Sequence, residues 1–282
     1  MPRAAVQRVT ADDLGAYAAA GRRIVAVTAY TTPEARCCDE AGADLILVGD
    51  SLGRAVLGLS DELRVTMEDM LRHTAAAARG VRRALLAADL PFLAYQADPA
   101  EAVRNAGRLV QAGASAVKLE GGAERADTVR RIVSAGMPVI GHLGFTPQSV
   151  RRFGGARVQG RDDAAATRLL ADARALAAAG CCAIVLEMMP APVAARVSAV
   201  AGVPTIGIGA GTGCSGQILV LYDLLGLSAR PPRLARTYAD VAGTMRQAVA
   251  AYAADVRAGT FPGPAETHDG RSWGEAGGEA PG

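Results

Sequence analysis

Three acidic residues stand where apolar, strand-like runs of the sequence end. Asp50 follows LILVG, Asp89 follows LLAA and Glu120 follows AVKL. A parallel barrel or sheet gathers the ends of its strands on one face, so these distant carboxylates would share one pocket. Convergent carboxylates suit a hard cation such as Mg²⁺, usually with water and substrate oxygens as further ligands. Each acid alone could cap a helix or pair with a surface cation, but the three together favour a metal site.

Two polar residues accompany these acids. Lys118 precedes Glu120 by two residues, so both side chains should point to the same face of one strand. A lysine in an apolar strand is costly unless an anion pairs with it, and the carboxylate of a substrate would serve. A buried ion pair without function is the alternative. Ser51, beside Asp50, could bind the same substrate or cap a helix.

Three further features could belong to the same site. Glu187 ends the run AIVL before Met-Met-Pro, and such an apolar setting disfavours a charged carboxylate, as suits a general base. A structural acid with an ion pair under the barrel rim is the alternative. His142, in GHLG, could orient a substrate or hold a polar network. The glycine-rich segment 206–216 lacks the opening of a dinucleotide-binding unit and better fits close backbone approach at a barrel mouth.

Strand-like and helical segments alternate along the chain and would position these residues. Strands are predicted near 24–28, 45–48, 84–88, 116–119, 137–141, 183–187, 204–208 and 217–221. Helices are predicted at 33–41, 66–79, 99–112, 124–135, 162–179 and 191–201. A glycine follows each helix, as expected for left-handed C-terminal caps: Gly42, Gly80, Gly113, Gly136, Gly180 and Gly202. The pattern predicts the α/β class and a single-domain (β/α)8 TIM barrel.

The ends of the chain differ from this repeating pattern. Residues 1–20 are interpreted as an N-terminal lead-in segment and 21–262 as the catalytic barrel domain. Within that domain, 237–258 is predicted to form a last amphipathic helix. Residues 263–282 carry almost no large apolar side chains, so we expect a disordered C-terminal tail.

Composition excludes several classes of protein. The 282 residues are 50% hydrophobic and 4% aromatic, as in a barrel filled by small aliphatic side chains. The net charge of +2 is spread along the chain, which argues against nucleic-acid binding. We see neither a signal peptide nor an apolar run of the ~18 residues that a membrane helix requires. The five cysteines have no disulfide or zinc spacing, and we expect a soluble cytoplasmic protein with small-molecule partners.

Longer motifs in the same order resemble one enzyme family. They span about residues 20 to 262 and read LILVGDSLG, ADLPFLAY, AVKLEGG, GHLGFTPQSV, GGARVQGR, VPTIGIGAG and GQILVLYDLLG. With them the chain resembles the ketopantoate (3-methyl-2-oxobutanoate) hydroxymethyltransferases of the phosphoenolpyruvate/pyruvate barrel superfamily. The resemblance implies transfer of a hydroxymethyl group from 5,10-methylenetetrahydrofolate to C3 of 3-methyl-2-oxobutanoate, giving 2-dehydropantoate for pantothenate synthesis. It also implies a homodecamer.

The resemblance assigns roles to the residues singled out above. Asp50 and Asp89 would bind Mg²⁺, and Glu120 would complete the metal environment. The 2-oxo acid would contact Asp50, Ser51, Asp89 and Lys118, and Glu187 would accept the C3 proton. His142 and Tyr30 are possible pocket residues.

Departures from the family pattern leave the substrate open. Thr31 stands where an acid is usual, the loop 59–64 differs, Ser215 replaces a common Asp, Tyr222 replaces a His, and Met188 and Met189 replace the usual Cys-Val. We expect these changes to cluster near the barrel mouth, so a paralogue acting on a different 2-oxo acid or acceptor is the alternative. A folate-independent lyase or mutase of the superfamily is another, although its usual KKCGH-like cysteine loop is absent. A non-enzymatic barrel that binds a 2-oxo acid is the third.

Overall fold

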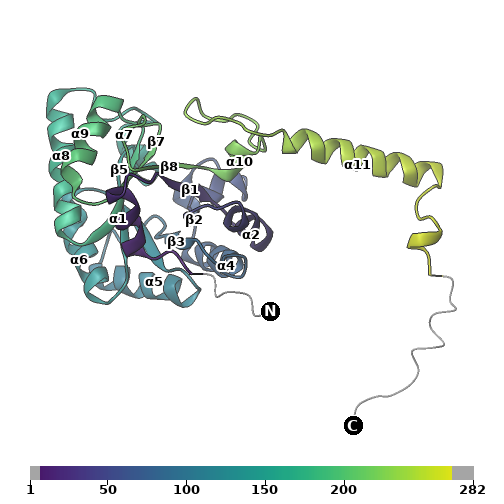
Figure 1. The fold of residues 1–282 in the computed structure, drawn as a ribbon, viewed down its shortest axis with the longest axis horizontal. Coiled ribbons are helices and arrows are strands. Elements are labelled where there is room, and N and C mark those ends of the chain that lie inside the picture. Colours follow the sequence, from purple (N-terminus) through teal and green to yellow (C-terminus); the bar gives the residue numbers. More distant parts are fainter. Residues whose placement is uncertain (1–6, 269–282) are drawn as a thin grey trace, which may run out of the picture.

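Eight parallel strands pair in sequence order, and the first pairs with the last to close a barrel (Figure 1). The structure is a computed structural model that describes residues 7–268. The strands are β1 Ile24–Thr28, β2 Leu45–Val48, β3 Leu85–Asp89, β4 Ala116–Glu120, β5 Val139–Gly144, β6 Cys181–Glu187, β7 Thr205–Ile208 and β8 Gly216–Leu219. All eight overlap the predicted segments, and the predicted TIM barrel is confirmed.

Helices surround the barrel and connect its strands. The α-helices are α1 Ala11–Ala19, α2 Thr32–Glu40, α3 Leu52–Ala55, α4 Met67–Ala78, α5 Pro99–Gln111, α6 Ala126–Ser134, α7 Val150–Phe153, α8 Asp163–Ala178, α9 Ala191–Ala201, α10 Leu221–Leu224 and α11 Val241–Ala258. The 3-10 turns are η1 Glu62–Arg64, η2 Ala123–Arg125, η3 Pro147–Ser149 and η4 Pro264–Glu266. The predicted helices agree with α2, α4, α5, α6, α8 and α9 to within two residues at each end.

Two apolar clusters separate the inside of the barrel from its outer layer. On β2, Leu45 and Leu47 belong to the inner cluster, whereas Ile46 and Val48 pack in the outer cluster with the helices. This alternation is the two-residue period of a strand that is buried on both faces. Leu14 of α1 belongs to the inner cluster, so the lead-in segment contributes to the barrel core.

The connection from β7 to β8 departs from the regular βα repeat. Residues 209–215 join the two strands without a helix. A Cβ on Gly211 would lie 2.5 Å from the Cβ of Ala191, and one on Gly213 would lie 2.9 Å from the Cβ of Ala195. These glycines let the connection pass close to α9. The high glycine content of the segment therefore follows from close packing against a helix, in addition to close backbone approach at the barrel mouth.

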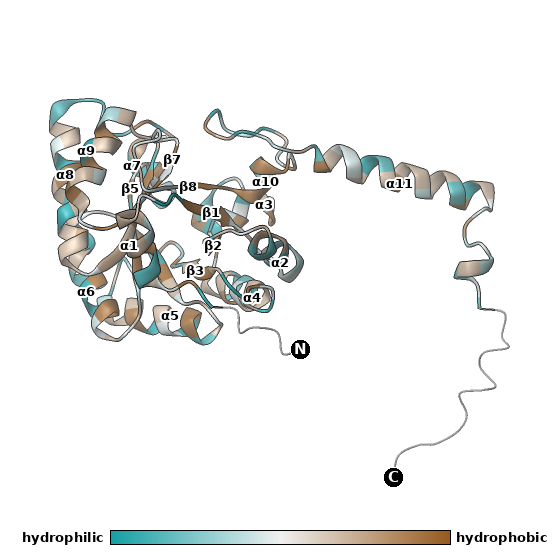
Figure 2. Cartoon of the chain, viewed as in Figure 1, coloured by the Kyte–Doolittle hydropathy of each residue, from teal (hydrophilic) through white to brown (hydrophobic). Residues whose placement is uncertain are grey.

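The chain after β8 leaves the barrel. α11 begins at Val241, four residues later than predicted, and projects away from the barrel (Figure 1). Apolar residues recur along this projecting helix (Figure 2). Of the predicted disordered tail, 263–268 contains η4, and 269–282 lies outside the described residues. None of the helices within 7–268 combines the length and the apolar character that a membrane span needs.

Candidate active site

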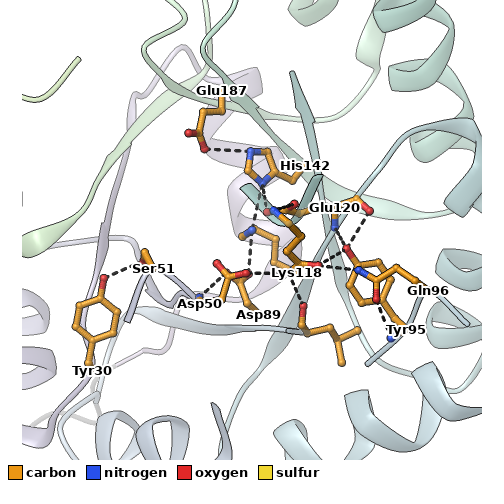
Figure 3. A network of polar contacts seen from close by, with 12 residues as sticks. Tyr30, Asp50, Ser51, Asp89, Tyr95, Gln96, Lys118, Glu120, His142 and Glu187 are labelled. Atoms are coloured by element: carbon orange, nitrogen blue, oxygen red, sulfur yellow. Dashed lines mark hydrogen bonds and ion pairs between the residues drawn. The ribbon is translucent and has the colours of Figure 1, made fainter. Parts of the chain in front are cut away.

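Strand alternation brings the predicted site residues to the inner face of the barrel. Ala87 on β3 and Ala116 on β4 belong to the inner apolar cluster. Residues two and four positions further along each strand must share that face, at its carboxyl end. The same rule applied to β5 and β6 gives one polar layer above the apolar core, shown in Figure 3: Asp89, Lys118, Glu120, His142 and Glu187.

Asp50 and Asp89 form a buried pair at the ends of β2 and β3. Only 4% of Asp50 and 2% of Asp89 is exposed, and the backbone N–H of Asp50 donates to Oδ2 of Asp89 at 3.0 Å. Burial raises the pKa of Asp50 well above its usual value, and the nearby Asp89 carboxylate raises it further. Burial also raises the pKa of Asp89, against the opposing effect of the Lys118 ammonium group. Two carboxylates that repel each other in a desolvated place would be stabilised by a cation.

Lys118 supplies a positive charge within the same layer. Its Nζ lies 3.0 Å from Oδ1 of Asp89 and 3.3 Å from Nδ1 of His142. Burial alone would lower the pKa of Lys118, but the carboxylates of Asp89 and Glu120 outweigh burial and raise it. Lys118 and Glu120 share the inner face as predicted, and the lysine is charged there.

His142 connects Glu120 to Glu187. Its Nδ1 lies 3.5 Å from Oε1 of Glu120, and its Nε2 lies 3.3 Å from Oε2 of Glu187. Burial and the Lys118 charge lower the pKa of His142, but contacts with these two carboxylates outweigh them and raise it. The side chain of Glu187 is 16% exposed, whereas that of His142 is 3% exposed. Glu187 therefore contacts a histidine and is the more exposed of the two side chains.

Ser51 and Tyr30 meet beside Asp50. The two hydroxyl groups lie 2.9 Å apart, and the hydroxyl of Thr28 donates to that of Tyr30 at 2.8 Å. Ser51 precedes α3 but makes no capping hydrogen bond, so its role as a helix cap is excluded. Tyr30 is fully buried, and burial raises its pKa. Tyr30 thus positions the Ser51 hydroxyl through a hydrogen bond.

Gln148, which the sequence reasoning missed, joins both halves of the polar layer. Its Nε2 donates to Oδ2 of Asp50 at 2.8 Å and to the Leu90 carbonyl at 2.9 Å. Its backbone N–H donates to Oε2 of Glu120 at 2.9 Å, and its Oε1 accepts from the Tyr95 hydroxyl at 2.9 Å. A single glutamine in a loop carries no chemical signature, and only its place within GHLGFTPQSV pointed to it.

The acidic side chains suit a magnesium site with two carboxylate ligands better than a site in which the protein supplies every ligand. No three His, Cys, Asp or Glu side chains among residues 7–268 lie close enough together to hold a metal ion. Mg²⁺ commonly uses one or two carboxylates and fills its remaining positions with water and substrate. Asp50 and Asp89 provide such a pair. Asp89 Oδ1 has an ion-pair partner in Lys118, and Glu120 Oε1 lies 3.5 Å from Nδ1 of His142, but neither buried oxygen accepts a hydrogen bond from residues 7–268. Glu120 lies next to this pair and accepts a hydrogen bond from Gln148 through Oε2.

The family departures do not all lie at the barrel mouth. Thr31 caps α2. The Tyr222 hydroxyl donates to Oε1 of Glu34 at 3.1 Å, and the Tyr222 ring packs against that of Tyr30. Ser215 exchanges hydrogen bonds with Thr205 where β7 and β8 begin. Strands begin at the face opposite the site, so the expectation that Ser215 lies near the mouth is wrong.

The changed loop 59–64 does lie at the mouth. Asp61 pairs with Arg151 at 2.8 Å, and Leu63 lines a cavity together with Glu120. This loop therefore borders the candidate site directly, and the changed residues Met188 and Met189 follow Glu187 in the chain.

Solved structures share this barrel fold. The fold is similar to a putative phosphonomutase from Burkholderia cenocepacia, with a TM-score of 0.60, 18% identity and coverage of 88% of this chain and 99% of that one. It is also similar to 2,3-dimethylmalate lyase, described as a PEP mutase/isocitrate lyase superfamily member, with a TM-score of 0.58, 18% identity and coverage of 92% and 93%. At this identity the likeness shows the barrel fold alone.

Sequence comparison then shows the family. The family model of ketopantoate hydroxymethyltransferase matches residues 8–264. The 3-methyl-2-oxobutanoate hydroxymethyltransferase of Pyrobaculum islandicum is 55% identical, covering 84% of this chain and 90% of that protein. The enzyme of the same name from Chloroflexus aurantiacus is 53% identical, covering 91% and 92%. The chain belongs to the ketopantoate hydroxymethyltransferase family and is a hydroxymethyltransferase, which confirms the family and enzyme class indicated by the motifs.

Proposed function

We propose that this chain transfers a hydroxymethyl group from 5,10-methylenetetrahydrofolate to C3 of 3-methyl-2-oxobutanoate, forming 2-dehydropantoate, with Mg²⁺ bound by Asp50 and Asp89. One observation carries the proposal. A charged, buried lysine lies between a carboxylate pair and a histidine–glutamate pair, in a chain about half identical to enzymes of that name. The ion would act as a Lewis acid that polarises the 2-oxo group and makes the C3 hydrogen more acidic.

The residues around this pair would bind the 2-oxo acid. Lys118 is charged and buried, so its ammonium group can neutralise the substrate carboxylate at little cost in reorganisation. The Ser51 hydroxyl, held by Tyr30 at 2.9 Å, can donate a second hydrogen bond. Together these groups would orient C3 toward Glu187.

Glu187 would act as the general base. Its carboxylate accepts the proton when the C3–H bond breaks, and His142, 3.3 Å away, holds the carboxylate in place. The electron pair left at C3 forms the new carbon–carbon bond to the one-carbon unit of the folate. Water supplies the hydroxyl oxygen, and both carbon–nitrogen bonds of the one-carbon unit break. Tetrahydrofolate leaves with its two nitrogens protonated, one proton coming from C3 and one from water.

The positions of the departures bear on the choice of substrate. Ser215 lies at the opposite end of the barrel, so it does not contact a 2-oxo acid bound beside Asp89 and Lys118. Thr31 and Tyr222 follow β1 and β8, and the Tyr222 ring packs against Tyr30 rather than against these two residues. The resemblance to known lyases is one of fold only, so no observation on the site favours a folate-independent lyase.

Deuterium exchange at C3 of 3-methyl-2-oxobutanoate tests the 2-oxo acid site without folate. We expect Mg²⁺-dependent exchange that falls about 100-fold or more in Glu187→Gln, because general bases contribute at least that much. Asp89→Asn should lose exchange because it loses the cation. Glu101→Gln, an exposed change on α5, is the control. Normal exchange in both site variants, or no ketopantoate from the wild type with folate, would contradict the proposal.

We also propose a cytoplasmic homo-oligomer, with the decamer implied by the family resemblance as its form. All five cysteines are free thiols, as suits a reducing compartment. The projecting α11, with its exposed apolar residues, supports assembly with further copies.

A further inference from the structure

A cavity of about 400 Å³ opens beside Glu120. It lies at the carboxyl ends of β3, β4 and β5 and shares Glu120 and Gln148 with the candidate active site. The loop after β3 contributes Phe92, and the segments after β4 and β5 contribute arginines. Cavities of this size hold ligands much larger than a five-carbon 2-oxo acid. The cavity therefore has room for the other substrate.

Guanidinium groups make one wall of this cavity positive. Arg125, Arg151 and Arg152 line it, against the carboxylates of Glu120 and Glu124. Arg151 pairs with Asp61, but neither Arg125 nor Arg152 forms an ion pair with any residue in the range 7–268. Arg125 donates to the Gln96 carbonyl at 3.2 Å, which fixes its position and leaves other N–H groups free. Two guanidinium groups without acidic partners suit a ligand that carries carboxylates.

The loop after β3 adds an apolar side to the same cavity. Phe92 lines the cavity and is only partly buried. The next residue, Leu93, adopts a φ of 66° although it is not glycine, and 59% of it is exposed. Such strain costs free energy and is typical of loops that are shaped for binding. An aromatic group beside Phe92 would cover this apolar surface.

We propose that this cavity binds the folate co-substrate, with its ring system against Phe92 and its glutamate carboxylates on Arg125 and Arg152. The inference rests on the proposed function and adds the donor site to it. A reduced folate combines an aromatic part with a terminal dicarboxylate, which matches the two sides of the cavity. The small 2-oxo acid has its own buried cation, Lys118, and does not need these arginines.

Arg125→Gln, Arg152→Gln and the double variant test the proposal. We expect the KM for 5,10-methylenetetrahydrofolate to rise about 10-fold for each change, with a much smaller effect on kcat, because each removes a charge-assisted contact. 5,10-Methylenetetrahydropteroate, which lacks the glutamate, should show no such difference between wild type and variants. Arg130→Gln, an exposed change on α6, is the control. Deuterium exchange at C3 needs no folate and checks that the 2-oxo acid site is intact.

Two outcomes would overturn the proposal. An unchanged KM for the folate in the double variant would remove the arginines from the donor site. Equal sensitivity of the pteroate and the folate to the substitutions would show that the arginines do not bind the glutamate. Calorimetric titration of wild type and double variant with tetrahydrofolate measures binding without turnover. If the wild type bound tetrahydrofolate through these arginines but formed no ketopantoate, the proposed reaction would fail while the binding site stood.

Discussion

Gln148 shows how one neutral side chain can set the geometry of several charged ones. Its side-chain amide donates a hydrogen bond to Oδ2 of Asp50, and its backbone N–H donates one to Oε2 of Glu120. Both acids are thereby oriented by the same loop residue, which is itself 6% exposed. Groups that orient metal-binding carboxylates in this way are often nearly as important for metal affinity as the carboxylates themselves.

Gln148→Met should weaken Mg²⁺ binding about 10-fold, because Asp50 loses the donor that holds it. The Leu90 carbonyl and Asp50 would also lose a buried partner, so the free energy of unfolding should fall by about 1–3 kcal/mol. Calorimetric titration with Mg²⁺ and denaturant unfolding measure the two effects. Gln217→Met, on the exposed side of β8, is the matched control. A loss of stability with unaltered Mg²⁺ affinity would show that Gln148 only fills space.

At the scale of elements, glycines that look alike in sequence perform different tasks. Gly113, like four of the other predicted caps, has positive φ and ends its helix in the left-handed conformation. Gly80 lacks this conformation. A Cβ there would lie 2.3 Å from the Thr32 carbonyl oxygen, so Gly80 instead lets the end of α4 approach the start of α2. The prediction of a left-handed cap at Gly80 was wrong because it considered only one helix.

Gly80→Ala should lower the free energy of unfolding by about 1–3 kcal/mol, because α2 and α4 must move apart. Gly107→Ala should raise it by roughly 0.5–1 kcal/mol, because Gly107 lies within α5 with nothing within 4 Å of an added Cβ. Urea unfolding of both variants checks the pair. Equal effects of the two substitutions would contradict the assignment of Gly80 to a helix contact.

At the scale of the whole molecule, one apolar face of α11 is left exposed to solvent. Its apolar residues follow the spacing of one helix face, and they are 57%, 66%, 56% and 46% exposed: Met245, Val249, Tyr252 and Val256. A projecting helix with such a face is stabilised by packing against another surface. This is the reason for the proposed assembly of several copies.

Val249→Asp with Tyr252→Asp should reduce the size of the oligomer, because two charges would have to be buried where apolar groups pack. Light scattering coupled to size-exclusion chromatography measures the mass. Gln247→Asp, an exposed change on the same helix, is the control. Circular dichroism should show that the barrel keeps its secondary structure. An unchanged mass in the double variant would exclude this face of α11 from the assembly.

The sequence by itself determined the strands, their order and the residues that face inward. Strand periodicity is local, so Lys118 and Glu120 could be assigned to one face from a spacing of two residues. The order of the motifs also indicated the family, as the comparisons confirm.

Only the tertiary structure decided which side chains meet. Gln148 and Asp50 are 98 residues apart in the chain, and their hydrogen bond depends on barrel closure and on the path of the loop after β5. Likewise, the pairing of β5 with β6 brings His142 beside Glu187. Such contacts leave no periodic trace in the sequence because they join different strands and loops, and the shape of the whole barrel sets their distances.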